Sequence, residues 1–124
     1  MYNVLVCDDE KDIVSALQIY LKSEGYQVFS AYNGKEALKI INREDIQLVL
    51  MDIMMPEMDG LEMLQSIRKD FQISHIPVII LTAKNDEGAK TKAITLGANA
   101  YITKPFSKEY LLARIEQLLG ERKL

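Results

Sequence analysis

The most constraining feature of the sequence is a change in hydrophobic spacing that occurs five times along the chain. Each time, a short continuous apolar run is followed by a longer segment with apolar residues at helical intervals. Short continuous runs are typical of parallel strands buried on both faces of a sheet, and the longer repeat is typical of amphipathic helices. The five runs are residues 4–7, 28–29, 48–51, 78–81 and 100–102.

Five strand–helix units in succession predict an α/β fold, with a doubly wound, five-stranded parallel sheet and five helices on its two faces. Asn33, Asp59 and Ser107 stand where three of the helices would begin, and their side chains are expected to cap the first turn. The fourth helix, over residues 86–96, is expected to be weak, because Gly88 and two threonines lower its helix propensity.

Length and composition predict one globular domain. The 124 residues fall in the usual single-domain range, and 48% hydrophobic with 27% charged residues is ordinary for a globular protein. We expect the domain to cover residues 1–120, because Gly120 closes the last helix. Residues 121–124 are then a tail or the start of a linker.

Charge and cysteine content argue against several other classes of protein. The net charge of −3 and the absence of a Lys/Arg run argue against nucleic-acid binding by this domain. The apolar runs are too short to cross a bilayer, and the N-terminus lacks the pattern of a signal peptide. A single cysteine, Cys7, excludes an internal disulfide. These features predict a cytoplasmic protein that does not bind membranes.

Polar side chains follow four of the five runs, where the strands would end. The first run leads into the acidic residues 8–10, the third into Asp52, the fourth into Thr82 and the fifth, after one more residue, into Lys104. In open α/β sheets, ligands bind beyond the carboxyl ends of the strands. If the first and third strands are neighbours, their carboxylates share one pocket at that edge.

Several carboxylates in one pocket repel one another, and Lys104 alone cannot neutralise them, so either pKa values rise or a cation binds. A hard cation held by carboxylates and water is typically Mg²⁺. Asp8 and Asp9 suit the metal. Asp52 is the candidate nucleophile, because it stands alone and central and because Asp can form an aspartyl phosphate. Lys104 and Thr82 would then direct a charge and a hydroxyl at a transferring phosphoryl group.

Each of these residues also has a simpler interpretation. The acidic residues 8–10 could complement the macrodipole of a helix, and Asp52 could form a turn. Thr82 could cap a helix, and Lys104 could be a surface lysine. Polar groups from four strands at one edge of one sheet favour a common site over separate coincidences.

Four segments of the chain carry a resemblance to a known family, namely residues 4–10, 50–60, 80–83 and 97–106. In this order and spacing they closely resemble the receiver domains of two-component response regulators. The resemblance covers essentially the whole chain. It implies a flavodoxin-like fold with the strand order 2-1-3-4-5.

The resemblance implies that Asp52 accepts a phosphoryl group from a histidine kinase, with Mg²⁺ as the cofactor. The implied metal ligands are Asp9, Asp52 and the backbone carbonyl of Met54, with Asp8 holding the metal through water. Lys104 is implied to pair with the phosphoryl group, and the peptide bond that follows Lys104 is expected to be cis.

The same resemblance implies a signalling switch, which catalyses only its own phosphorylation and dephosphorylation. Thr82 would move toward the phosphoryl oxygens, and Tyr101 would swing inward. The fourth helix, fifth strand and fifth helix would then act on a separate protein or on an output domain beyond Leu124, such as one that controls transcription. A phosphorylation-dependent homodimer is a further expectation. Asn99 and Ala100 stand where winged-helix members usually carry two acidic residues that support this dimer.

Two alternatives remain open from the sequence. A metal-dependent phosphohydrolase with an aspartyl-phosphate intermediate would need a second carboxylate two residues beyond Asp52, where this chain has Met54. A receiver-like interaction module that is not phosphorylated would be expected to lack an acidic, threonine or lysine residue of the site, and this sequence retains all of them.

Overall fold

The computed structural model describes residues 1–55, 57–83 and 87–120. Five parallel strands form one sheet in the order β2-β1-β3-β4-β5, which confirms the predicted flavodoxin-like topology. The strands are β1 (Asn3–Cys7), β2 (Gln27–Ala31), β3 (Leu48–Asp52), β4 (Val78–Ala83) and β5 (Ala100–Lys104).

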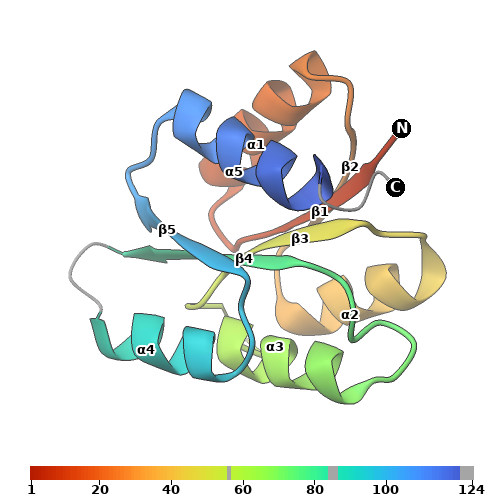
Figure 1. Ribbon diagram of the computed structural model, residues 1–124, viewed down its shortest axis with the longest axis vertical. Helices are drawn as coiled ribbons and strands as arrows, with labels where there is room; N and C mark the ends of the chain where they lie inside the picture. The colour runs from red at the N-terminus through yellow and green to blue at the C-terminus, as the bar shows by residue number, and fades with distance from the viewer. Residues whose placement is uncertain (56, 84–86, 121–124) are drawn as a thin grey trace.

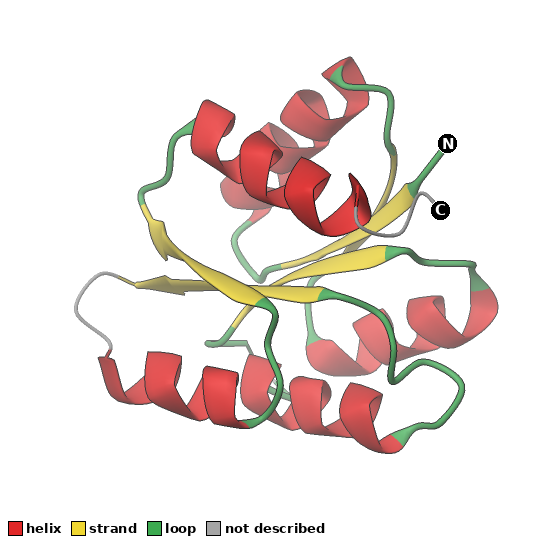
Figure 2. Ribbon diagram, viewed as in Figure 1, coloured by secondary structure: helices red, strands yellow, loops and turns green. Residues whose placement is uncertain are grey.

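Helices cover both faces of the sheet, as Figures 1 and 2 show. On one face lie α1 (Lys11–Ser23) and α5 (Lys108–Gly120). On the other face lie α2 (Gly34–Arg43), α3 (Gly60–Lys69) and α4 (Glu87–Thr95). The sequence placed the start of the fourth helix at Asp86, which lies outside the described residues.

Three helices begin with the side-chain caps expected from the sequence. Asn33 Oδ1 accepts a hydrogen bond from the Glu36 amide at 2.8 Å. Asp59 Oδ1 accepts one from the Glu62 amide at 2.9 Å, and Ser107 Oγ accepts one from the Tyr110 amide at 3.0 Å. Each cap satisfies an amide that the helix itself leaves without a partner.

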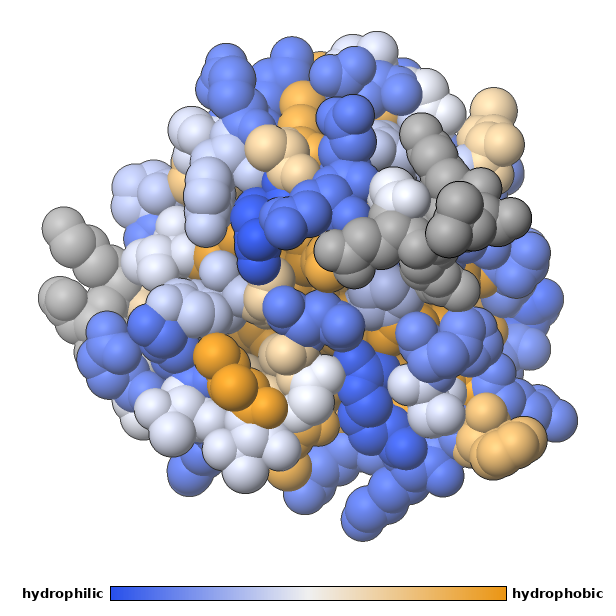
Figure 3. Space-filling view, in the orientation of Figure 1, coloured by the Kyte–Doolittle hydropathy of each residue, from blue (hydrophilic) through white to orange (hydrophobic). Residues whose placement is uncertain are grey.

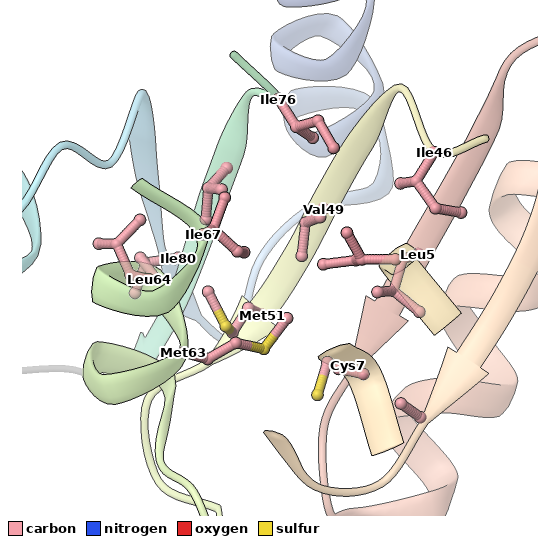
Figure 4. Close-up of a cluster of buried hydrophobic side chains, with 14 of the residues drawn as sticks. Leu5, Cys7, Ile46, Val49, Met51, Met63, Leu64, Ile67, Ile76 and Ile80 are labelled. Atoms are coloured by element: carbon pink, nitrogen blue, oxygen red, sulfur yellow. The ribbon is translucent and has the colours of Figure 1, made fainter. Parts of the chain in front are cut away.

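Two hydrophobic clusters form the core, one on each face of the sheet. Successive residues of a strand point to opposite faces, so Leu5 and Val49 enter the cluster under α2 and α3, whereas Val4 and Leu48 enter the cluster under α1 and α5. Figure 4 shows the first cluster, in which Cys7 lies fully buried. All five residues of β3 are buried, which explains why the third apolar run is continuous.

Few buried apolar side chains attach helix α4 to the sheet. Ala93 is the only described residue of α4 that is fully buried, whereas Ile94 is 53% exposed. This arrangement agrees with the weak helix expected from the sequence.

The outer surface is mainly polar on the face shown in Figure 3, with hydrophobic side chains only in small patches. Among the residues that the structure describes, no helix has the length and hydropathy needed to cross a lipid bilayer.

Candidate functional site

The strands bring the polar residues singled out in the sequence to one edge of the sheet. Asp8 follows β1 directly, and Asp52 is the last residue of β3. Thr82 lies one residue before the end of β4, and Lys104 ends β5. These ends are in register, because Asp52 pairs with Leu81 on β4, and β4 in turn pairs with β5. The remaining strand, β2, ends in a buried alanine.

Four carboxylates converge at this edge. One carboxylate oxygen from each of Asp8, Asp9, Glu10 and Asp52 lies within 4.8 Å of the others. Asp8 is fully buried and Asp52 is 6% exposed, whereas Asp9 and Glu10 are exposed. A set of oxygen ligands that is buried on one side and open to water on the other fits Mg²⁺, which keeps several of its waters when bound.

Among the described residues, Lys104 is the cation that contacts this cluster. Its Nζ lies 2.8 Å from Asp8 Oδ2, 3.4 Å from Asp52 Oδ2 and 3.6 Å from Glu10 Oε1. Burial lowers the pKa of Lys104, but the hydrogen bond to Asp8 and the negative charges of Asp52 and Asp8 outweigh it and raise the pKa above its usual value. The ammonium group is therefore charged and shared between carboxylates from β1 and β3.

The surroundings of Asp52 disfavour its charged form and raise its pKa above the usual value. Burial raises its pKa most, and the charge of Asp8 raises it further. Lys104 and the Met54 amide, which donates to Asp52 Oδ1 at 3.4 Å, lower the pKa only in part. A divalent cation at this edge would remove the remaining penalty and leave Asp52 as a carboxylate.

The loops around the cluster are held by short hydrogen bonds and a close approach of the backbone. Asp8 Oδ1 accepts a hydrogen bond from the Glu10 amide at 2.9 Å, which turns the chain after β1. The Gly60 amide donates to the Ile53 carbonyl at 2.8 Å, so the start of α3 lies against the end of β3. A Cβ atom on Gly60 would come within 2.4 Å of the Asp52 carbonyl oxygen, so only glycine fits there.

The two expected switch residues lie beside the cluster rather than within it. Thr82 is buried, and its hydroxyl has a long contact of 3.5 Å with the Ala83 carbonyl. Tyr101 is half-buried against the core, with Lys90 Nζ 4.2 Å from the centre of its ring. The expected cis peptide bond between Lys104 and Pro105 is present.

A pocket of about 480 Å³ opens around Asp52, and its walls combine residues singled out in the sequence with others that were given no role there. Ile13 and Pro105 give it an apolar rim, and Met54, 72% exposed, lies at its mouth. The sequence pattern predicts no separate role for Glu10, which is simply the last residue of the acidic run 8–10, whereas the structure places its carboxylate in the cluster. Its position next to two aspartates was the available signal.

Comparison with known proteins agrees with this geometry. A family model described as the response regulator receiver domain matches residues 4–116. The chain belongs to this family. The receiver is similar to the Francisella response regulator 1452 receiver domain, with 36% identity, a TM-score of 0.91, and coverage of 99% of this chain and 100% of that one.

The receiver is also similar to the chemotaxis response regulator CheY4 of Vibrio cholerae. That match has 30% identity and a TM-score of 0.89, and it covers 95% of this chain and 98% of CheY4. A CheY-like response regulator receiver domain protein from Methanospirillum hungatei matches with 31% identity and a TM-score of 0.92, covering 99% and 97% of the two chains.

Proposed function

We propose that Asp52 of this receiver accepts a phosphoryl group from a histidine kinase in a Mg²⁺-dependent reaction. The observation that carries this proposal is the group of carboxylates from β1 and β3 within 4.8 Å of one another, with Lys104 Nζ between Asp8 and Asp52. Such a group is poorly stable by itself, but it is suited to a cation and to an incoming phosphoryl group.

In this proposal Asp9, Asp52 and the Met54 carbonyl hold the metal, and Asp8 holds it through water. Bound Mg²⁺ supplies positive charge that neutralises the phosphoryl oxygens. An oxygen of Asp52 forms a bond to phosphorus while the bond between phosphorus and the donor nitrogen breaks. Lys104, already 3.4 Å from Asp52, pairs with a phosphoryl oxygen.

The phosphoryl group then changes the balance between two arrangements of the domain. It adds about −1.5 to −2 charge and three acceptor oxygens next to Thr82. The Thr82 hydroxyl, which makes a long 3.5 Å contact with the Ala83 carbonyl, can donate to one of these oxygens instead. Tyr101 follows into the space that Thr82 leaves, and the surface formed by α4, β5 and α5 changes.

We further propose that this surface acts on an output domain or a separate protein, and that the domain can form a phosphorylation-dependent homodimer. The receiver would work as a signalling switch, catalysing only its own phosphorylation and dephosphorylation. We also propose that the receiver works in the cytoplasm.

The proposal is tested by incubating the protein with Mg²⁺ and acetyl phosphate and measuring its intact mass. We expect one added phosphoryl group on the wild type and on Asp45→Asn, a matched substitution at an exposed carboxylate before β3. We expect none on Asp52→Asn and none in EDTA.

Each other outcome contradicts the proposal in a different way. A phosphoryl group on Asp52→Asn would place the acceptor elsewhere. An unmodified wild type would indicate an interaction module that is not phosphorylated. Rapid turnover of phosphate esters would indicate a phosphohydrolase.

A further inference from the structure

Arg68, in the last turn of α3, uses its whole guanidinium group to join two loops. Nε and Nη2 donate to the Gly97 carbonyl at 3.0 and 2.8 Å, and Nη2 also donates to Asn99 Oδ1 at 2.8 Å. Nη1 donates to the carbonyls of Ser74 and Ile76 at 3.2 and 2.8 Å. Among the described residues Arg68 forms no salt bridge, so the carbonyl and amide oxygens are what compensate its charge.

The loops that Arg68 joins lie at the edge of the sheet opposite Asp52. Ser74 and Ile76 precede β4, whereas Gly97 and Asn99 lie between α4 and β5. Figure 1 shows α3 and α4 side by side beneath the sheet, with this connection at the C-terminal end of α4. The guanidinium group therefore sits at the negative end of the α4 dipole and binds a carbonyl there.

The chain at this corner is shaped to receive the guanidinium group. Gly97 has a φ of +102°, and a Cβ atom on Gly97 would lie 3.0 Å from Arg68 Nε. The amides of Leu96, Gly97 and Ala98 donate back to carbonyls of α4 at 2.9, 3.0 and 2.9 Å, so three carbonyls in the last turn of the helix have partners. These contacts form one unit, which we call the Arg68 clasp.

The Arg68 clasp contrasts with the rest of α4. Ala93 is the only described residue of the helix that is fully buried, and Ile94 is exposed. Three hydrogen bonds from Arg68 reach Gly97 and Asn99, just beyond the C-terminal end of α4, and two more tie the same guanidinium group to the segment before β4. Ala89, nearer the start of the helix, is only partly buried against the core. The N-terminal end of α4 lies at the edge of the sheet where β4 delivers Thr82.

We propose that Arg68 is a positioning residue that fixes the C-terminal end of α4, so that α4 moves at its N-terminal end when Asp52 is phosphorylated. The movement of α4 rests on the proposed function. The anchoring of its C-terminal end by Arg68 does not. Motion at the N-terminal end would change the contacts of α4 with Tyr101 on β5, where Lys90 Nζ now lies 4.2 Å from the ring centre.

The side-chain oxygen of Asn99 accepts two of the hydrogen bonds at this corner. Its Oδ1 accepts from the Val78 amide at 2.9 Å and from Arg68 Nη2 at 2.8 Å. Both partners are donors, so a carboxylate can replace the amide oxygen. We expect Asn99→Asp to keep the clasp and Asn99→Leu to weaken it at Val78 and Asn99 only.

The experiment is amide hydrogen exchange, measured by NMR on the full chain with and without Mg²⁺ and beryllofluoride, an unreactive stand-in for the phosphoryl group. In Arg68→Lys, which keeps the charge but loses the planar fork, we expect exchange of the Val78, Gly97, Ala98 and Asn99 amides to rise at least tenfold. Exchange in β1 and β3 should not change.

The matched control is Arg43→Lys. Arg43 ends α2, its side chain is 65% exposed, and within the described part of the chain it pairs only with neighbouring Glu44, so this variant should leave exchange at 96–99 unchanged. In the wild type we expect beryllofluoride to change exchange in the first turns of α4 and not at 96–99. In Arg68→Lys we expect the change to extend to 96–99.

Two results would overturn the inference. One is unchanged exchange at 96–99 in Arg68→Lys, which would show that the guanidinium group does not hold this corner. The other is a beryllofluoride effect in the wild type that is as large at Gly97 as at Ala89. If beryllofluoride changes nothing anywhere, the proposed function and the movement of α4 both fail, while the fixed end is still decided by exchange without beryllofluoride.

Discussion

Asp8 and Asp52 are both buried carboxylates, but their partners differ. Asp8 has a 2.8 Å contact with Lys104 and a 2.9 Å hydrogen bond from the Glu10 amide. Among the described residues, Asp52 has two polar contacts, from Lys104 Nζ and the Met54 amide, and each is 3.4 Å long. Asp52 therefore keeps more of its acceptor capacity for a ligand, and this difference favours Asp52 over Asp8 as the acceptor.

The cost of an ionised Asp52 leads to a test of stability. In EDTA at neutral pH, we expect Asp52→Asn to raise the free energy of unfolding by about 1 kcal/mol, because it removes a buried charge next to Asp8. Urea unfolding followed by circular dichroism measures the change. Asp45→Asn is the control, and we expect it to have little effect.

The sign of the pH dependence follows from the raised pKa of Asp52. A folded-state pKa above the unfolded value of 3.8 means that the stability from this group is present at low pH and is lost as the pH rises through the folded-state pKa. The gain from Asp52→Asn should thus be small below pH 3.8 and complete at neutral pH. A gain that is largest in acid would contradict this explanation.

The sequence could predict Asp8, Asp52, Thr82 and Lys104 because strand ends in a parallel sheet meet at one edge, so position along the chain becomes position in space. Arg68 could not be found in this way. Four of its five hydrogen bonds end on backbone carbonyls, and every residue type supplies a carbonyl. Only the path of the loops brings these oxygens together.

At the scale of elements, the strands were easiest to predict where they are buried on both faces. All residues of β3 are buried, and its apolar run nearly matches its bounds. The edge strand β2 is only partly buried, so its apolar run of two residues is shorter than the strand Gln27–Ala31. Burial, rather than strand propensity alone, sets how much of a strand the hydrophobic pattern reveals.

The weakness of α4 can be tested by stiffening its first turn. Gly88 lies in α4, and a Cβ atom there would meet nothing within 4 Å. We expect Gly88→Ala to raise the free energy of unfolding by about 0.5 kcal/mol, because alanine loses less backbone entropy in a helix. Urea unfolding measures the gain, and slower amide exchange in α4 should accompany it.

A second glycine provides the opposite control. Gly25 has a φ of +88°, so Gly25→Ala should lower the free energy of unfolding by about 1 kcal/mol even though its surroundings are open. A similar loss from Gly88→Ala would show that α4 requires glycine at this position, and the attribution of its weakness to helix propensity would be wrong.

At the scale of the whole molecule, the carboxylate cluster is joined to both hydrophobic clusters. Asp8 directly follows β1 and Asp52 ends β3, and each of these strands sends alternate side chains to the two faces of the sheet. Unfolding of the sheet therefore separates the carboxylates. A cation that needs them together binds the folded chain and not the unfolded one, so it stabilises the entire domain.

This coupling gives a test in which the metal is the variable. At a Mg²⁺ concentration of about 100 times its dissociation constant, we expect the free energy of unfolding to rise by about 2.7 kcal/mol relative to EDTA at matched ionic strength. Asp9→Asn should remove most of this gain, because Asp9 is one of the proposed metal ligands. Asp9 is exposed, so the substitution should leave the core intact. Asp45→Asn should keep the gain. Equal Mg²⁺ stabilisation of the wild type and Asp9→Asn, measured by thermal unfolding, would show that the ion binds away from the cluster.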